Sequence, residues 1–186
     1  MSLGGARSGQ SPQPDNPDKL LLGSGTVSIT EWKVDHDELI CVVREPLIGH
    51  APTDQNRELI VFRKTAVGLS EAFRFESQLR LISMYPLWDR GGDLMTVWQG
   101  GSAYHFYVFN YSDRKVRVAL EAGSKSPPEI VGSIASPRNR PYILATDTMG
   151  FPTDSKKWKT KIYIWNGHEY ALLETVKFGR RLTRLK

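Results

Sequence analysis

The 186-residue chain has a single cysteine, four histidines and no long apolar run, and each scarcity narrows the classes of protein to consider. Cys41 lies in the apolar run LICVV and can form no disulfide within the chain, so we expect a buried structural thiol. No stretch approaches the roughly 18 apolar residues of a membrane-spanning helix. The amino terminus also lacks the charged-then-apolar plan of an export signal. We therefore expect no membrane span.

The signatures of common enzyme and metal sites are missing as well. The sequence contains no G-x-S-x-G elbow, Walker loop, H-E-x-x-H or C-x-x-C. Its histidines stand singly, in predicted turns or at strand starts: His36, His50, His105 and His168. We expect no catalytic residues, no metal and no cofactor. A hydrolase with a site assembled across strands stays open as a third hypothesis, because catalytic triads are defined by geometry and not by order.

The positive charge is concentrated in two segments of the chain. The formal net charge is +5, and the last seven residues, RRLTRLK, carry four positive charges. The other cluster is KKWKTK at 156–161. A nucleic-acid footprint needs Lys and Arg gathered on one face. With only these two clusters we do not expect a nucleic-acid partner.

The composition divides the chain into three parts. Residues 1–18 are rich in Gly, Ser, Pro and Gln, which predicts a disordered tail. Residues 19–179 should form one β domain, and 180–186 a basic tail that is either a closing strand or a flexible end.

The clearest local signal is the segment 161–178, KIYIWNGHEYALLETVKF, in which Asn-Gly joins two apolar strands as in a β-hairpin. A similar layout occurs at 58–75 and 105–120, so the hairpin is predicted to be one unit of a degenerate repeat. The repeats cover about 24–77, 78–124 and 127–178.

Each repeat is predicted to hold four strands, A to D, with the hairpins as C and D. Strand A is expected at 26–34, 79–87 and 129–136, and strand B at 38–44, 93–99 and 142–148. In strand C we align Phe62, Phe109 and Trp165, which lie 47 and 56 residues apart. The period of about 50 residues is in the range of propeller blades.

Strand C is apolar on consecutive residues in all three copies: LIVF, FYVF and IYIW. A strand with one face in water would alternate, so both faces should be covered, as when one sheet is stacked between two others. We predict an all-β fold of three four-stranded antiparallel, propeller-like blades. A three-sheet β-prism or barrel is the alternative.

The C to D pattern YIWNGHEYALLE resembles blades of bacterial β-propeller proteins of the FG-GAP or VCBS-like type, over residues 24–178. The calcium loop D-x-D-x-D-G of many such repeats is missing, because 35–38 has the wrong spacing and no glycine. The resemblance implies a binding or assembly module, often outside the cytoplasm. On that basis we favour an extracytoplasmic location, with the export signal absent from this chain.

Three blades are fewer than the four to eight with which propellers close. An open arc would expose apolar faces on its terminal blades. Two arcs related by a two-fold axis would complete a six-bladed ring, so we expect a homodimer. A fragment of a larger chain is the other remedy.

The longest B to C connections, at 46–57 and 150–160, both contain Pro-Thr-Asp. Equivalent loops should emerge on one rim, where loops on a rigid scaffold commonly bind partners. The plain alternative is a turn stabilised by Pro and Asp. The candidate binding residues on this rim are Thr53, Asp54, Trp98, Tyr104, Thr153, Asp154 and Trp158.

The leading hypothesis is therefore a non-enzymatic module that contacts a protein, or a second copy of itself, through the B to C rim. The alternative is a small lectin-like propeller, in which a sugar ring stacks on an indole. Trp158, between Lys157 and Lys159, is the tryptophan expected to be exposed. The other tryptophans lie in or beside predicted strands, where packing between sheets is the simpler explanation: Trp32, Trp88, Trp98 and Trp165.

Overall fold

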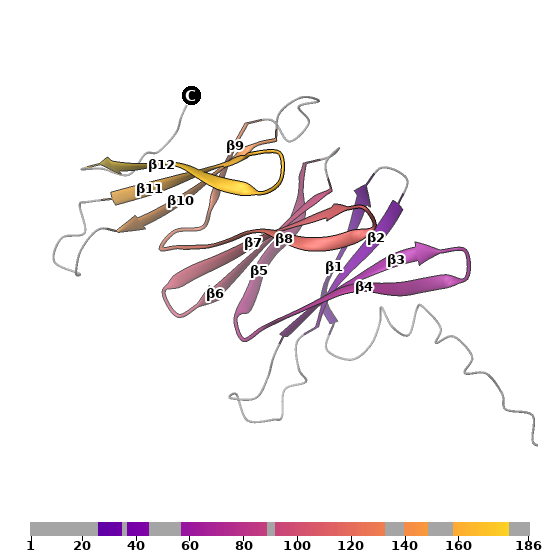
Figure 1. Ribbon diagram of the computed structural model, residues 1–186. Coiled ribbons are helices and arrows are strands. Elements are labelled where there is room, and N and C mark those ends of the chain that lie inside the picture. The colour runs from indigo at the N-terminus through magenta and orange to yellow at the C-terminus, as the bar shows by residue number, and fades with distance from the viewer. Residues whose placement is uncertain are drawn as a thin grey trace, which may run out of the picture.

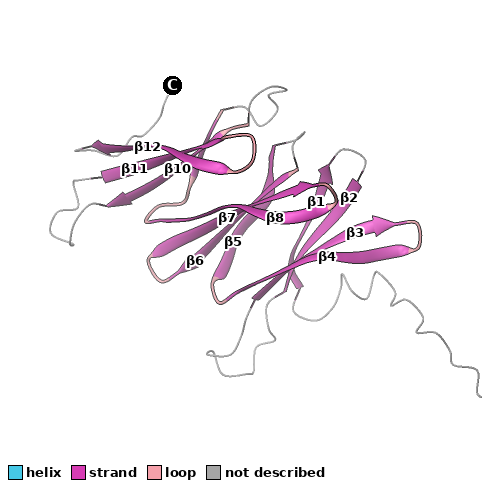
Figure 2. Ribbon diagram, viewed as in Figure 1, coloured by secondary structure: helices cyan, strands magenta, loops and turns pink. Residues whose placement is uncertain are grey.

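The computed structural model describes residues 26–34, 37–44, 57–88, 92–132, 140–148 and 158–178. The described part is built of β-strands, turns and short loops, as Figure 2 shows. None of its elements is a helix long and apolar enough to cross a membrane. The prediction of an all-β chain is confirmed.

In the described part of the chain, twelve strands form three separate antiparallel sheets of four, each a simple meander in chain order. Sheet 1 consists of β1 (Thr26–Val34), β2 (Asp37–Arg44), β3 (Arg57–Thr65) and β4 (Gly68–Ser77). Sheet 2 consists of β5 (Arg80–Trp88), β6 (Asp93–Gly100), β7 (Ala103–Ser112) and β8 (Lys115–Ser124). Sheet 3 consists of β9 (Glu129–Val131), β10 (Tyr142–Thr148), β11 (Trp158–Trp165) and β12 (Tyr170–Phe178).

The three sheets correspond to the three predicted repeats, with β1, β5 and β9 as the A strands. The bounds of β1 and β10 are those expected, and most other strands differ by one to three residues. Strand β9 is the main difference, because it ends at Val131 instead of continuing to 136. Residues 133–136 lie outside the described part.

The sheets stack face to face in chain order (Figure 1). Between sheets 1 and 2, the core combines side chains such as Trp32 and Val61 with Trp98 and Phe109. Between sheets 2 and 3, a second core is formed by Leu87, Met95, Val97, Phe106, Val108, Ala119, Leu120, Ile143, Ala145, Tyr163 and Tyr170. Sheet 2 therefore contributes both of its faces to a core.

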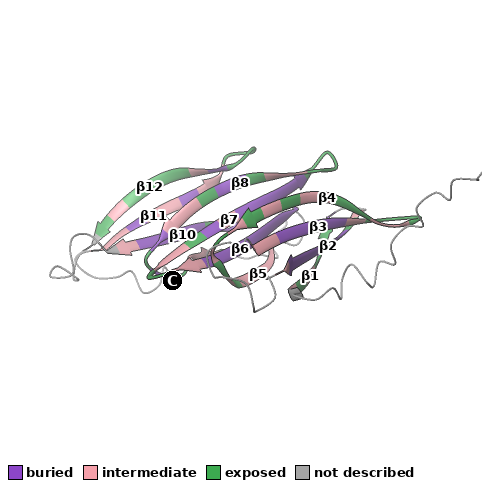
Figure 3. Cartoon of the chain, turned by 90° about the horizontal axis from the view of Figure 1, so that it is seen from below, coloured by how far each residue is buried: buried purple, intermediate pink, exposed green. Residues whose placement is uncertain are grey.

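The inner strands are buried on consecutive residues, as the unbroken apolar runs predicted. Six successive residues of β6, from Asp93 to Trp98, are buried, and so are four in β3. Figure 3 shows the contrast between these strands and the exposed positions along β4, β8 and β12. Cys41 of β2 is fully buried, and burial raises the pKa of its thiol, which fits a structural role.

The described sheets do not close on themselves or on one another, so neither the alternative barrel nor a closed ring is present. The terminal face of sheet 1 also differs from expectation. Val42 and Ile60 point to the face opposite the shared core, yet both are fully buried. The apolar centre of that face is inaccessible in the single chain, so the expected exposed apolar face is not present there.

Each C to D hairpin contains one register shift at a comparable place. One residue of strand D is inserted opposite the pairs Val61/Phe62, Val108/Phe109 and Ile162/Tyr163, and it is Ala72, Ala119 and Leu173 respectively. From Phe62, Phe109 and Tyr163 to the inserted residue the spacing is ten residues in every hairpin. By this register Tyr163, and not Trp165, matches Phe62 and Phe109.

The Asn-Gly turn differs in detail from a two-residue hairpin loop. β11 ends at Trp165 and β12 begins at Tyr170, so four residues connect them. The side-chain oxygen of Asn166 accepts hydrogen bonds from the backbone N–H groups of His168 and Glu169, both at 2.9 Å. Gly167 has a φ of 103°, which favours glycine. The hairpin itself is confirmed.

Candidate functional site

The strand ends that carry the predicted rim lie on one side of the stack. Figure 1 shows the three C to D turns on the right and the β6–β7 turn, with the start of β11, on the left. Residues 101–102 form this β6–β7 turn. We call this left-hand end, from that turn to the start of β11, the B–C rim. Four predicted site residues lie outside the described part: Thr53, Asp54, Thr153 and Asp154.

Trp98 is part of the core and not of the rim surface. Its side chain is fully buried between sheets 1 and 2, and its indole N–H donates to Thr96 Oγ1 at 2.8 Å. The ring packs 6.1 Å, centroid to centroid, from Phe75. A surface ligand could not reach it, so we exclude Trp98 from the candidate binding surface.

Tyr104 and Trp158 remain at the rim, on neighbouring sheets. Tyr104 is the second residue of β7 and is half-buried against the core between sheets 2 and 3. Trp158 is the first residue of β11, is also half-buried, and pairs with Thr148 and Phe178 on either side. Each side chain can offer part of its ring to a partner. Trp158 is less exposed than predicted.

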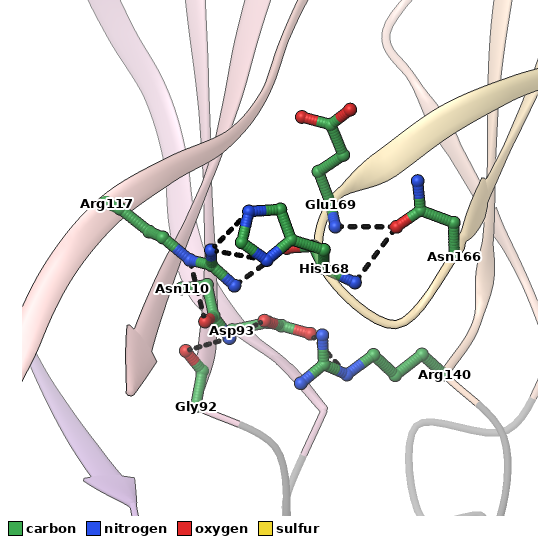
Figure 4. Close-up of polar contacts among 8 residues, drawn as sticks. All are labelled: Gly92, Asp93, Asn110, Arg117, Arg140, Asn166, His168 and Glu169. Atoms are coloured by element: carbon green, nitrogen blue, oxygen red, sulfur yellow. Dashed lines mark hydrogen bonds and ion pairs between the residues drawn. The ribbon is translucent and has the colours of Figure 1, made fainter. Parts of the chain in front are cut away.

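A buried polar cluster, which the sequence did not predict, lies between sheets 2 and 3 (Figure 4). Asp93, the first residue of β6, has no exposed surface. Its Oδ2 lies 3.1 Å from Nε of Arg140, which directly precedes Pro141 and β10. Its Oδ1 accepts a hydrogen bond of 2.7 Å from Nδ2 of Asn110 in β7. The carboxylate thus links two strands of sheet 2 to sheet 3.

Arg140 is held on a second side by an aromatic ring. Its guanidinium carbon lies 3.4 Å from the centroid of Trp165. Burial lowers the pKa of Arg140, while the nearby Asp93 opposes that shift. Burial raises the pKa of Asp93 to about 6, against the opposing effects of Arg140 and Asn110. Desolvation therefore destabilises the charged carboxylate more than Arg140 and Asn110 stabilise it.

Arg117 of β8 makes a second contact to sheet 3, at the Asn-Gly turn. One terminal nitrogen donates to the carbonyl oxygen of His168 at 2.8 Å, and the other lies 2.9 Å from its Nδ1. Because a guanidinium only donates, the facing imidazole nitrogen is an acceptor. Arg117 Nε also reaches Oδ1 of Asn110 at 3.4 Å, which joins this contact to the buried cluster.

The interface between sheets 1 and 2 has a related arrangement. Asp37 begins β2 as Asp93 begins β6, and its Oδ2 accepts a hydrogen bond of 2.8 Å from the Tyr111 hydroxyl in sheet 2. The backbone N–H of Tyr111 donates to the carbonyl of Gly92 at 2.7 Å. In both interfaces the first residue of strand B bonds forward to the next sheet.

These polar groups connect and orient sheets. A carboxyl with a pKa near neutrality can exchange a proton, but Asp93 is inaccessible to a substrate. Its Oδ1 accepts a hydrogen bond from Asn110, and its Oδ2 forms the ion pair with Arg140. Within the described residues, no three His, Cys, Asp or Glu side chains converge as metal ligands would. The side chains that a partner could reach lie at the B–C rim and along the edge strands.

Exposed apolar side chains are concentrated on edge strands. Leu172 and Leu173 of β12 are 53% and 57% exposed, and the bulge places them side by side on the outer edge of sheet 3. Ile29 of β1 and Ile82 of β5, both in A strands, are also exposed. Val118 of β8 is also exposed.

Comparison of the chain with protein-family models, curated proteins and solved structures finds no match. The resemblance to FG-GAP or VCBS-like blades therefore stays a hypothesis from the sequence of residues 24–178.

Proposed function

We propose that the chain is a non-enzymatic binding or assembly module of the β-propeller type, which contacts a protein through the B–C rim and the β12 edge. The observation that carries the proposal is the exposed pair Leu172 and Leu173. An edge strand leaves backbone groups unpaired, and adjacent exposed leucines add apolar surface beside them. Such an edge is suited to contact with another protein chain.

The difference between sheets at the bulge supports this proposal. In sheet 2 the inserted residue is Ala119, which is 4% exposed and packs in the core shared with sheet 3. In sheet 3 the inserted residue is Leu173, which is more than half exposed. A large apolar side chain therefore stands at the position where, one sheet earlier, a small one is covered by the next sheet.

The rim supplies the second part of the proposed surface. Tyr104 and Trp158 are half-buried aromatic residues on β7 and β11. Both strands are held in place by the core between sheets 2 and 3. Aromatic residues are enriched where proteins meet, because they provide large contact areas with few rotatable bonds. Loops on a rigid scaffold are also where partners commonly bind.

Site-specific photocrosslinking tests the rim. Ser102, exposed in the β6–β7 turn, is replaced by a photoreactive amino acid, and in a matched protein Asp113 in the β7–β8 turn is replaced instead. The two turns lie at opposite ends of sheet 2 (Figure 1). We expect a discrete protein adduct from position 102 and not from position 113. Equal labelling from both ends, or no adduct from position 102, contradicts the proposal.

A further inference from the structure

The strand register places Trp158 and Phe178, the described residues next to the two basic segments, side by side at one end of sheet 3. Trp158 pairs with Phe178, and Lys159 pairs with Lys177. The run before Trp158 contains Lys156 and Lys157, and the run after Phe178 contains Arg180 and Arg181. Both runs lie outside the described residues, but chain continuity begins them at one pair of neighbouring strand ends. The described strand ends next to these two runs, Trp158 and Phe178, are therefore neighbours.

The described lysines at this end share one face of sheet 3. Lys159 and Lys161 alternate along β11, and Lys177 is directly opposite Lys159. Two residues further along β11, Tyr163 on the same face packs in the core with sheet 2. The lysines therefore stand just beyond the part of this face that sheet 2 covers.

A fourth lysine approaches the same place from sheet 2. The backbone N–H of Lys125 donates to the carbonyl of Thr146 in β10 at 3.1 Å. Its Nζ donates to Oγ of Ser102, in the β6–β7 turn, at 3.2 Å. We call Lys125, Lys159, Lys161 and Lys177 the basic corner.

The charge of the basic corner is poorly compensated. Asp147, which pairs with Lys159, is the one acidic residue in that row of the sheet. Across the described residues, the lysines of β11 and β12 form no ion pair. In sheet 1, by contrast, Lys33 pairs with Glu31 and Lys64 pairs with Glu38.

The direct pairing of Lys159 with Lys177 is unfavourable for the sheet. Like charges opposite each other on neighbouring strands destabilise the pairing. A bound polyanion would remove this repulsion and release its counterions in exchange for the lysines.

We propose that the basic corner binds single-stranded nucleic acid through its phosphates. This goes beyond the proposed protein contact and adds a second class of partner. Sheet 2 stands beside the lysine-bearing face, so an extended, flexible strand can enter the corner, whereas a flat membrane cannot lie against it. The sequence alone predicts no nucleic-acid partner. The shared face of Lys159, Lys161 and Lys177, which follows from the strand register, is the reason to revise that expectation.

Binding of a fluorescein-labelled single-stranded oligonucleotide to the full chain, followed by anisotropy at several salt concentrations, tests the proposal. Four phosphate contacts predict a slope of log affinity against log salt of about −3. The double variant Lys159→Gln with Lys177→Gln should lower the magnitude of this slope by about 1.4. The matched double variant Lys33→Gln with Lys115→Gln removes the same charge elsewhere and should leave the slope unchanged.

The melting temperature separates binding from folding. Because Lys159 and Lys177 repel each other, their replacement should keep or raise the melting temperature while binding is lost. No binding by the unaltered chain at low salt overturns the proposal, and so does an equal loss in the two double variants. Binding to vesicles rich in anionic lipid that depends on Lys159 and Lys177, with no binding of the oligonucleotide, would assign the corner to a membrane instead. None of these results depends on the protein contact at position 102.

Discussion

Asp93 and Arg140 form an ion pair that joins sheet 2 to sheet 3, with 3.1 Å between Oδ2 and Nε. The carboxylate is fully buried, and the guanidinium is covered on one face by Trp165. Hydrogen bonding between Asp93 and Asn110 fixes the acid within its own sheet. The pair therefore fixes the position of sheet 3 against sheet 2, and its contribution to the free energy of unfolding can be measured.

Asp93→Ala should destabilise the chain by about 3–5 kcal/mol, because it leaves Arg140 largely buried without its carboxylate. Replacing both partners, with Asp93→Leu and Arg140→Met, should recover part of that loss. Denaturant unfolding measures both. As a control, Lys64→Met breaks the exposed pair with Glu38 and should change stability little. A small effect of Asp93→Ala would show that the pair does not link the sheets.

The stability of the chain should also depend on the protonation of Asp93. Burial raises its pKa from an ordinary 3.8 to about 6, so the folded state binds the proton more tightly than the unfolded state. The resulting stability is fully present below about pH 4 and is lost as the pH rises through 6. Because the Asn side chain does not titrate, the unfolding free energy of the unaltered chain should fall relative to that of Asp93→Asn between pH 4 and 7, and the two proteins should differ most at the neutral end. A constant difference would contradict the raised pKa.

Substitutions at the inserted bulge residues, Ala119 and Leu173, test whether the two matching positions are packed differently. Ala119→Leu enlarges a buried side chain and should cost about 1–3 kcal/mol through overpacking. Leu173→Ala reduces an exposed side chain at the matching position and should leave the melting temperature nearly unchanged. Thermal unfolding followed by circular dichroism compares the two. Similar losses would mean that Leu173 is packed as Ala119 is.

The two tryptophans that the sequence predicts on the rim, Trp98 and Trp158, should lose different amounts of stability when each is replaced by alanine. Trp98→Ala removes a fully buried ring between sheets 1 and 2 and should cost about 3–5 kcal/mol. Trp158→Ala removes a half-buried ring at a strand end and should cost clearly less. Chemical denaturation measures both losses, and an equal loss at the two positions would place Trp158 in the core as well.

Much of the fold could be predicted because local patterns determine it. The hairpin at 161–178 and the apolar runs of the inner strands gave the number of sheets, their strand order and most strand bounds. Pairing register was harder. The apolar runs align Trp165 with Phe109 as the last residue of each run, whereas the bulge opposite Ile162 and Tyr163 shifts the match by two residues.

The candidate site was predictable only in part. The sequence pattern could not show that Trp98 is buried. A strand covered on both faces has no alternation of polar and apolar residues from which the direction of a side chain could be inferred. The Asp93–Arg140 pair could not be predicted because its residues are 47 positions apart in sequence. Asp93 begins β6 and Arg140 lies just before β10, and a charged residue at such a place usually indicates a solvated turn. The basic corner likewise depends on which strand ends are neighbours, which composition alone does not specify.

The mass of the chain in solution, measured by light scattering across a wide range of concentration, tests whether the β12 edge is a contact surface. A β12 edge that contacts a second copy of the chain, as the expected homodimer requires, predicts mass that rises with concentration. It also predicts that Leu172→Ser with Leu173→Ser abolishes this rise, while Val67→Ser, at an exposed turn of sheet 1, does not. A chain that stays monomeric throughout, or an association unaffected by the two leucines, would contradict it.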